Sequence, residues 1–461
     1  MLTAYAAGLV GIQTADYPMF GRCFWEFCIA SSDWEYQLST VQRTCPSGGR
    51  EHLIWWQGWN GELARRHANG NAYVRGRAAW RKPGVAVSSM GSLPVALHTG
   101  ELFDNNVAVV LPHDPAHLPA IWCFCSSPEY AEAVRRIDQK LNVTNATLVK
   151  VPFDLERWQK VAAERYPHGL PEPDSDDPTQ GLFHGSVARS REPLQVAVAR
   201  LLGFRWPRQQ GQTVSGAGPV PDDGLGAHSD ADGVVCLPAV GGEMPAADRL
   251  RALLATAYGA DWSQASQEAL LAQAEYAGKS LEEWLRDGFF AQHARLFHNR
   301  PFIWHIWDGA KGGFSALVNY HKLDRRLLER LTYTYLGSWI TAQKQADEQG
   351  QAGANALHVA ALKLQEKLKA ILEGEPPYDI YVRWKPLHQQ PIGWEPDLND
   401  GVRMNIRPFV TAGILRSKFT INWNKDRGTD PEPNCSGTTE RLNDLHFTRE
   451  EKERARRIAP G

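Results

Sequence analysis

The hydrophobic residues in the first third of the chain form short runs separated by Gly and Pro, a pattern typical of β-strands. Strands are predicted at 83–88, 107–112 and 147–152. Between the last two, the segment 119–141 repeats apolar residues at helical spacing, with Ile137 and Leu141 among them. This mixture predicts an α+β domain over residues 1–166.

The next part of the chain differs in composition. Two stretches, 167–190 and 207–245, are rich in Pro, Gly, Asp and Ser, which is typical of exposed loops and linkers. We therefore predict a loop-rich linker over residues 167–245 and a domain boundary within it.

From residue 246 the apolar period becomes helical. The apolar residues from Leu250 predict a helix that ends at Gly259. The sequence from Ser280 to Glu283 matches a capping box, in which the Ser accepts a bond from the N3 amide and the Glu reaches back to the Ser amide. A second helix is therefore expected from Ser280, burying apolar side chains as far as Leu296.

A β-hairpin is predicted next, because the apolar runs 302–307 and 315–320 flank a glycine-rich segment. After it, helical spacing returns on both sides of the polar segment 343–355, which predicts a long helical hairpin. Residues 246–400 are thus expected to be mainly helical. The last part, residues 401–461, is polar and of mixed charge, and its end is expected to form a solvated helix.

Composition limits the classes of protein that the chain can represent. Its 461 residues exceed the roughly 250–300 residues of one hydrophobic core, so several folding units are expected. No apolar run approaches the roughly 20 residues that span a bilayer, and the N-terminus lacks a secretory pattern. Seven cysteines, an odd number, favour a reducing compartment. We therefore expect a cytoplasmic protein with no membrane partner.

The charge balance does not indicate a nucleic-acid binder, because 50 Lys and Arg stand against 52 Asp and Glu and leave a net charge of -2. A local basic face remains compatible with this balance. The closely spaced Cys23 and Cys28, like Cys123 and Cys125, do not match common zinc-site spacings and are interpreted as small buried thiols.

Motifs of catalysis are missing. The sequence contains no phosphate-binding G-x-x-x-x-G-K-[ST], no G-x-S-x-G elbow, no H-E-x-x-H and no C-x-x-C. The segment Glu375-Pro-Pro-Tyr378 resembles the catalytic loop of amino-methyltransferases, but a helix-to-strand turn before a strand at 379–384 is the favoured interpretation. Four clustered histidines are interpreted as hydrogen-bonded core or groove residues rather than metal ligands: His293, His298, His305 and His321.

Several segments together resemble one family. They are Gly11-Ile-Gln-Thr-Ala-Asp16, Phe20-Gly-Arg-Cys-Phe-Trp-Glu26, Leu102-Phe-Asp-Asn-Asn106, Arg300-Pro-Phe-Ile-Trp304 and Ala316-Leu-Val-Asn-Tyr-His321. The first two resemble the segment that follows the catalytic domain in large adenine-specific DNA methyltransferases of restriction–modification and phage-defence systems of the BREX and DISARM types. Ala15 stands where that pattern has Gly. The resemblance runs from about residue 8 to about residue 430.

The resemblance implies a target-recognition domain at residues 1–166, followed by a helical body that clamps DNA or docks a catalytic partner. It places Met1 close to where the methyltransferase domain would end. The S-adenosylmethionine loop and the catalytic loop are not present, so no cofactor is expected in this chain. The implied partners are double-stranded DNA, a methyltransferase catalytic domain or subunit, and other defence-system proteins. The alternatives are a complete nuclease or methyltransferase with an unrecognised site, and a structural subunit.

Residues suited to DNA contact cluster in the first domain. Cations around Tyr73 and Trp80 suit phosphate binding: Arg75, Arg77, Arg81 and Lys82. Polar residues on the loops suit base contacts: Ser88, Ser89, His98, Asn105 and Asn106. The cations could instead line a solvated strand edge, and the two Asn residues could form a turn. The group of Trp55, Trp56 and Trp59 is interpreted as a packing cluster rather than a stacking platform.

Overall fold

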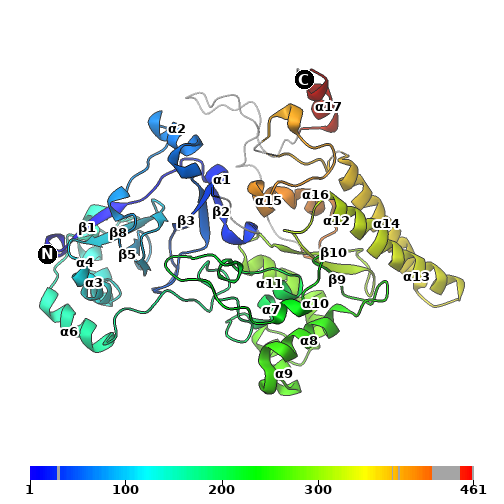
Figure 1. The fold of residues 1–461 in the computed structure, drawn as a ribbon, viewed down its shortest axis with the longest axis horizontal. Helices are drawn as coiled ribbons and strands as arrows, with labels where there is room; N and C mark the ends of the chain where they lie inside the picture. The colour runs from blue at the N-terminus through cyan, green and yellow to red at the C-terminus, as the bar shows by residue number, and fades with distance from the viewer. Residues whose placement is uncertain (28–31, 376, 383–384, 418–446, 459–461) are drawn as a thin grey trace. The chain divides into compact units, whose positions relative to one another are not determined.

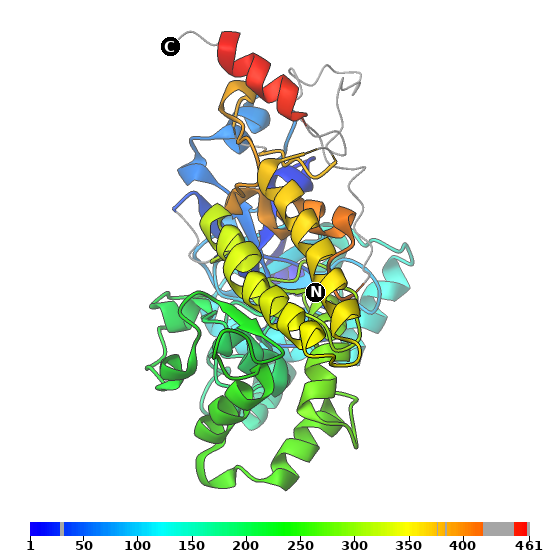
Figure 2. The same ribbon diagram turned by 90° about the vertical axis from the view of Figure 1, so that its right-hand side faces the viewer.

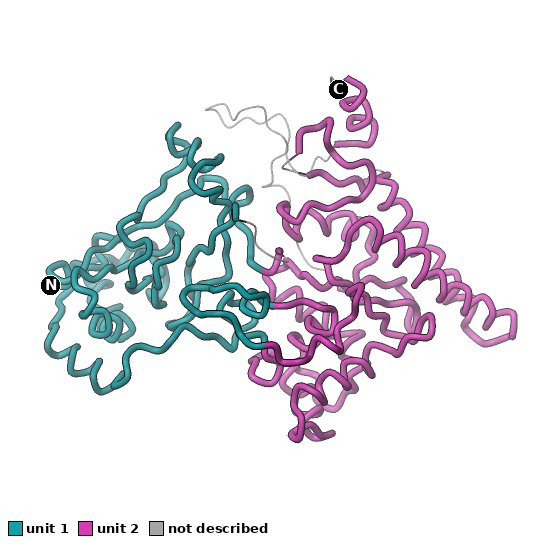
Figure 3. The backbone as a smooth tube through the Cα atoms, in the orientation of Figure 1, with its two compact units in different colours: residues 1–24, 29–185, 206–221 teal, residues 25–28, 186–205, 222–461 magenta. Residues whose placement is uncertain are grey.

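The fold is α+β, as predicted, with several small sheets and many helices. The computed structural model describes residues 1–27, 32–375, 377–382, 385–417 and 447–458. Figure 1 shows the order of the elements along the chain. The chain divides into two compact units, coloured in Figure 3. Unit 1 comprises residues 1–24, 29–185 and 206–221, and unit 2 comprises residues 25–28, 186–205 and 222–461.

The first sheet of unit 1 is antiparallel, with the order β1-β8-β5-β6. Its strands are β1 (Ala6–Val10), β5 (Gly84–Ser88), β6 (Val95–His98) and β8 (Val107–Pro112). Both of its faces are covered, because Val85 and Val110 face a core shared with helices while Ala86 and Val109 face Phe103. Coverage on both sides explains the nearly continuous apolar runs. The strands predicted at 83–88 and 107–112 are confirmed.

The second sheet of unit 1 has the order β2-β4-β3-β7, and β3 and β7 are parallel. Its strands are β2 (Gly21–Cys23), β3 (Trp34–Leu38), β4 (His52–Trp55) and β7 (Leu102–Phe103). Leu38 and Phe103 pack into the core beneath the first sheet. This sheet carries the segments that form the candidate site.

The helices of unit 1 are α1 (Tyr17–Phe20), α2 (Glu62–Ala68), α3 (Leu118–Cys125), α4 (Pro128–Ile137), α5 (Asn145–Leu148) and α6 (Leu155–Arg165). The helical segment predicted over 119–141 is divided into α3 and α4, because Ser127 accepts a hydrogen bond from the Tyr130 amide and starts a new helix. Leu141 lies beyond α4 and is exposed.

The strand predicted at 147–152 is wrong. Residues 145–148 form α5 instead, and residues 149–152 are not in a strand. Leu148, Val149 and Val151 are buried in the helical core beside α3, and the Tyr130 hydroxyl donates to the Leu148 carbonyl. Apolar residues that pack against helices without a strand to pair with do not need extended backbone.

Unit 2 contains most of the helices. They are α7 (Pro193–Leu201), α8 (Ala246–Tyr258), α9 (Gln264–Gln273), α10 (Leu281–Asp287), α11 (Phe289–Leu296), α12 (Arg325–Arg330), α13 (Leu336–Glu348), α14 (Ala354–Glu373), α15 (Gly401–Asn405), α16 (Arg407–Ala412) and α17 (Arg449–Ile458). The segment 167–245, predicted as a linker, contributes to both units and contains α7 and the strand β9 (Val234–Cys236).

The predicted β-hairpin is confirmed as β10 (Ile303–Trp307) and β11 (Ser315–Asn319), and β9 extends it to three strands. The predicted helical hairpin is confirmed as α13 and α14, which run side by side in Figure 2. The described part of the segment predicted as a strand at 379–384, residues 379–382, is not a strand. Its Val382 amide and carbonyl bond the side chain of Gln390 instead.

The helix ends predicted from the sequence in unit 2 are also confirmed. α8 ends at Gly259, and Ser280 and Glu283 form the predicted capping box of α10. The helix expected from Ser280 to Leu296 is interrupted at Gly288, where α10 gives way to α11. A Cβ at this glycine would lie 2.5 Å from a ring carbon of Tyr276, so the Tyr276 ring packs closely against the backbone where the two helices meet.

Of the four histidines near the hairpin, His293 and His305 are hydrogen-bonded core residues, as predicted, and the half-buried His321 bonds the Trp25 carbonyl, whereas His298 is exposed and stacks on the Trp25 ring. His293 lies between the side chain of Gln195 and the amide of Ile303, and His305 bonds the Ser315 hydroxyl. Burial lowers the pKa of His293 and that of His305 to about 3. Both side chains are therefore neutral near pH 7.

Two features are absent from the residues that the structure describes. None of their helices is both long enough and apolar enough to cross a membrane. They also contain no group of three or more His, Cys, Asp or Glu side chains placed to hold a metal ion. The thiols of Cys23, Cys123 and Cys125 are buried, as expected, whereas Cys28 lies outside the described residues.

Candidate functional site

The segment from Gly11 to Ala15 links two of the regions predicted to contact DNA. On one side Ile12 forms a parallel bridge with Asp104, and its amide donates to the Phe103 carbonyl at 2.8 Å. On the other side Gln13 and Tyr73 exchange backbone hydrogen bonds of 2.8 and 2.9 Å. The turn that holds the Asn pair and the strand-like segment that leads to Arg75 therefore flank the same segment.

The backbone of this segment explains two positions of the family-like pattern. A Cβ at Gly11 would lie 2.2 Å from the carbonyl oxygen of Phe103, so only glycine fits that approach. Ala15 has a φ of +59°, a left-handed conformation that glycine adopts more easily. The glycine that the family pattern has at this position therefore suits the turn that Ala15 makes.

Arg75 lies on an exposed edge beside this segment. Its guanidinium lies 4.9 Å from the ring centre of Tyr73, a ring that is 44% exposed. The buried Val74 between them places both side chains on the outer face. Within the residues that the structure describes, no carboxylate pairs with any of the four predicted cations, whereas many other arginines of unit 1 are paired, Arg65 and Arg157 among them.

Arg77 has a different environment. Its guanidinium lies 4.6 Å from the ring centre of Trp59 and 5.6 Å from that of Trp80. Trp56 stacks on Trp59 and is only 8% exposed, so the packing interpretation of the Trp group is confirmed for Trp56. Arg77 covers this aromatic cluster, and the contacts with the two rings hold its guanidinium in position.

Arg81 and Lys82 are exposed in a turn that follows Trp80 in the chain. The Arg81 amide donates to the Gly100 carbonyl at 2.8 Å, and a Cβ at Gly100 would lie 2.7 Å from the Arg81 Cα. The four cations therefore do not form one row. Arg75 flanks the segment from Gly11 to Ala15, and Arg81 and Lys82 flank the loop that leads into β7.

Asn105 and Asn106 form the turn between β7 and β8, and both are exposed. The carboxylate of Asp104 accepts a hydrogen bond from the Asn106 amide at 2.9 Å and one from the Ser39 hydroxyl at 2.6 Å. The turn interpretation is therefore correct for the backbone. The Asn105 side chain takes no part in these bonds, since it has no hydrogen-bond partner among the described residues.

Ser88, Ser89 and His98 lie in the interior of unit 1, exposed by 5%, 5% and 1%. The Ser88 hydroxyl accepts a bond from the Val41 amide, and the Ser89 backbone bonds those of Asn106 and Val143. His98 lies 3.2 Å from the Ala79 carbonyl, and burial lowers its pKa. These three side chains are therefore buried beneath the exposed loops that hold the candidate cations and the Asn pair, and they do not lie on the surface.

A buried ion pair supports the loop beneath Arg81. Arg50 donates to Glu101 at 2.8 Å and to the carbonyls of Gly48 and Leu97. Burial disfavours ionisation of Glu101, but the Arg50 guanidinium outweighs it and lowers the pKa of Glu101 to about 2. The pair stays ionised near pH 7 and fixes the ends of β6 and β7.

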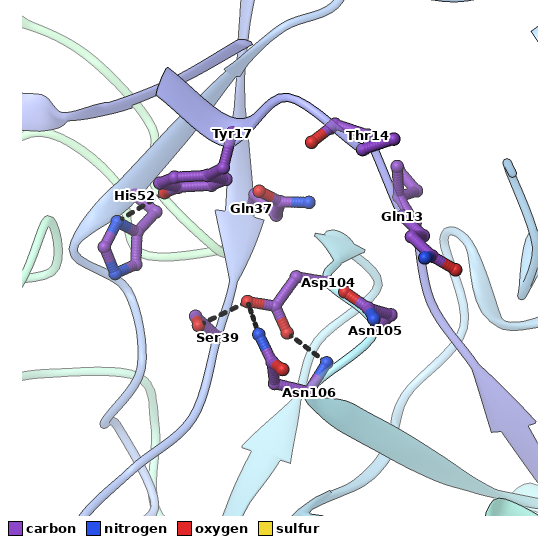
Figure 4. Close-up of a pocket in the computed structure, with 11 residues that line it drawn as sticks. Gln13, Thr14, Tyr17, Gln37, Ser39, His52, Asp104, Asn105 and Asn106 are labelled. Carbon is purple, nitrogen blue, oxygen red and sulfur yellow. Dashed lines mark hydrogen bonds between the residues drawn. The ribbon is translucent and has the colours of Figure 1, made fainter. Parts of the chain in front are cut away.

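An open pocket of about 420 Å³ lies beside the Asn105–Asn106 turn. Its lining comes from the segment beginning at Ile12, from β3 and β4, and from the Asp104 turn: Ile12, Gln13, Thr14, Ala15, Tyr17, Gln37, Ser39, His52, Asp104, Asn105 and Asn106. Figure 4 shows Gln37 between Tyr17 and the Asp104 turn. The Tyr17 hydroxyl and His52 Nδ1 are 2.8 Å apart.

Of the residues that line this pocket, the sequence indicated Asn105 and Asn106 as candidates for DNA contact. It did not indicate Gln37, Tyr17, His52 or Asp104. Gln37 is part of a strand whose alternation was not recognised, and it faces inward with only 2% of its surface exposed. Asp104 carried a signal, since it precedes the Asn pair in a typical turn sequence. The other side chains meet only through pairing between distant strands.

No known family model matches the chain. A stretch of 70 residues is 31% identical to the adenine-specific methyltransferase PglX of Lacticaseibacillus casei (strain Zhang). This stretch spans 15% of the chain and 6% of that protein. Part of the chain is therefore similar to part of an adenine-specific methyltransferase, a likeness that agrees with the resemblance seen in the motifs.

Proposed function

We propose that this chain is the DNA-recognition part of an N6-adenine DNA methyltransferase in a bacterial restriction–modification or anti-phage defence system. One observation carries the proposal: the unpaired Arg75 and the Asn105–Asn106 turn flank the same backbone segment of unit 1. Cations without carboxylate partners suit phosphates, and exposed amides beside them suit base edges. The similarity to PglX supports the choice of DNA methylation as the context.

In this proposal Arg75, Arg81 and Lys82 contact phosphates, and Arg77 positions the aromatic cluster beside them. Asn105 contributes to base contacts from the turn. The chain holds no S-adenosylmethionine, and methyl transfer is supplied by a catalytic domain or subunit that binds it in the cytoplasm. Ser88, Ser89 and His98 act beneath the surface, by holding its loops in place.

The first test is the salt dependence of duplex binding by the full chain. Each phosphate contact contributes about 0.9 to the slope of log K against log salt concentration. Replacing Arg75, Arg81 and Lys82 by Ala should lower the slope by up to about three such contributions. A matched control removes three exposed cations from α4 and α6 of the same unit: Arg136, Arg157 and Lys160. Equal slopes in the two triple variants would contradict the proposed face.

A second test asks whether the chain binds S-adenosylmethionine or methylates adenine by itself. Calorimetric titration of the chain with S-adenosylmethionine is expected to give no binding, and adenine methylation is expected only when a separate methyltransferase catalytic half is added. Methylation by this chain alone would favour the alternative of a complete enzyme. Methylation by the catalytic half that is unchanged by the chain would contradict the specificity role.

A further inference from the structure

A second pocket, the hairpin pocket, lies in unit 2 between α10, the start of α8 and the glycine-rich loop of the hairpin β10–β11. Its volume is about 170 Å³. A cavity of about 150 Å³ is enough to hold one benzene ring. The apolar part of its lining consists of Leu237, Pro238, Ala247, Leu285, Trp307 and Ala310. The hairpin pocket therefore suits a ligand with a small apolar body.

Two hydrogen-bond donors in the lining are unused. Arg416 donates from Nε to the Arg286 carbonyl at 3.0 Å and from Nη2 to Asp287 at 2.6 Å, and its Nη1 has no partner among the described residues. The indole N–H of Trp307 also lacks a partner there, and neither donor is closed off from solvent. Because the Arg416 guanidinium lies 3.9 Å from the ring centre of Trp307, the two donors are neighbours that one ligand can reach.

The charges around the pocket favour an anionic ligand. Arg286 binds Asp287 at 2.6 Å, so the guanidinium groups of Arg286 and Arg416 share one carboxylate. Glu282 also lines the pocket, but Arg251 binds its carboxylate at 2.5 Å and balances its charge. One positive charge thus remains in excess beside the apolar walls. A carboxylate supplies the opposite charge and accepts hydrogen bonds from a guanidinium with favourable geometry.

We infer that the hairpin pocket binds a small carboxylic acid with an aromatic or branched apolar body. The carboxylate accepts hydrogen bonds from Arg416 and from the Trp307 indole, and the apolar body packs on Leu237 and Leu285. Asp287 and the Trp307 ring already hold the Arg416 side chain in place, so binding costs little side-chain entropy. This site goes beyond the proposed function, since it belongs to unit 2 and involves no DNA.

The experiment titrates the full chain with 3-phenylpropanoate, with its uncharged amide and with acetate, and measures the affinities by calorimetry. The acid should bind about tenfold or more tightly than the amide, because hydrogen bonds to a charged group are stronger than those to a neutral one. Acetate, which lacks the apolar body, should also bind about tenfold or more weakly than the acid. No binding of the acid, or equal affinities of the acid and the amide, would overturn the inference.

Two variants locate the ligand. Arg416→Gln should abolish the preference for the acid over the amide, whereas Arg295→Gln, which changes a 72% exposed arginine outside the lining, should keep it. Ala310→Phe should fill the pocket and weaken binding of acid and amide alike by about tenfold or more. Lys311→Phe is its matched control, because the neighbouring Lys311 is exposed and does not line the pocket.

Melting temperatures show whether each variant is folded. A preference for the acid that Arg416→Gln retains, or binding that Ala310→Phe leaves unchanged, would place the ligand elsewhere and overturn the inference. If Arg416→Gln does not fold, Ala310→Phe against Lys311→Phe decides the question, since both substitutions lie in the hairpin loop and leave the Arg416 bonds intact. None of these outcomes affects the proposed DNA contacts of unit 1.

Discussion

At the scale of single residues, the candidate surface depends on close backbone contacts that particular amino acids permit. Gly11 lies with its Cα hydrogens against the carbonyl oxygens of Phe103 and Asp104, which a Cβ would approach to 2.2 and 2.4 Å. Backbone atoms cannot rotate away as a side chain does. Gly11 therefore determines the distance between the segment from Gly11 to Ala15 and the Asp104 turn.

Gly11→Ala is expected to push this segment away from β7 and to lower the free energy of unfolding of unit 1 by about 1–3 kcal/mol, the usual cost of overpacking. Thermal unfolding and duplex binding both report it, and both should be impaired. Ala15→Gly is the control, because Ala15 already has a positive φ and glycine adopts it without strain. Gly11→Ala with unchanged melting and binding would show that the segment moves freely.

At the scale of elements, the hairpin β10–β11 and the helices that cover it form a core with neutral histidines. His293 lies fully buried on α11, where it accepts from the Ile303 amide of β10 and contacts the Gln195 side chain of α7. His321, just beyond β11, lies 2.7 Å from the Trp25 carbonyl, and burial lowers its pKa to about 4. Two of these bonds, from His293 to Gln195 and from His321 to Trp25, join segments that are distant in sequence.

This core should make unit 2 sensitive to acid. The folded pKa of His293, about 3, is below the ordinary value of 6.5, so protons bind the unfolded state more tightly. Stability is therefore complete above about pH 6.5 and is lost as the pH falls toward 3, by about 1.4 kcal/mol per pH unit for one such group.

His293→Gln tests this expectation, since Gln does not titrate and keeps one donor and one acceptor. Chemical denaturation between pH 7 and pH 4 should show a shallower loss of unfolding free energy in the variant than in the wild type. His228→Gln is the control, because His228 lies on the surface beside Thr256. An identical pH profile for wild type and His293→Gln would mean that His293 is already accessible to protons.

At the scale of the whole molecule, the two compact units are interleaved along the chain. Residues 206–221 belong to unit 1, although residues 186–205 before them belong to unit 2. Trp206 explains this return: it is 1% exposed, donates to the Pro178 carbonyl at 2.8 Å and packs edge to face on Phe183. The same stretch of unit 1 bonds Arg50 through Gln180 and Gly181.

Trp206→Ala is therefore expected to destabilise unit 1, by about 3–5 kcal/mol as for other buried aromatic truncations. Hydrogen exchange in the full chain should become faster at 178–183 and 48–52 and stay unchanged at β10 and β11. Trp304→Ala, which removes a fully buried side chain of unit 2, should give the opposite pattern. Uniform loss of protection in both units with either variant would show that the two units unfold together and would contradict this expectation.

Local patterns in the sequence determined the parts of the fold that short-range physics controls. The capping box at Ser280, the stop at Gly259, the glycine-rich hairpin and the Val-rich strands each depend on neighbours within a few residues, and each was predicted. The α+β class follows from the same patterns. The motifs also supplied the likeness to adenine-specific methyltransferases, and with it the Arg and Asn residues beside the pocket.

Only the tertiary structure decided which of those residues face outward and what lies between them. Ser88 and His98 have the polar character of surface groups, yet sheet packing buries them, and the segment 147–152 has strand-like residues but no strand to pair with. Gln37 lines one pocket with Tyr17 and Asp104 because β3 pairs with β4 on one side and with β7 on the other. The β3–β7 pairing joins residues more than 60 positions apart, which no local pattern encodes, so the pocket exists only in the folded chain.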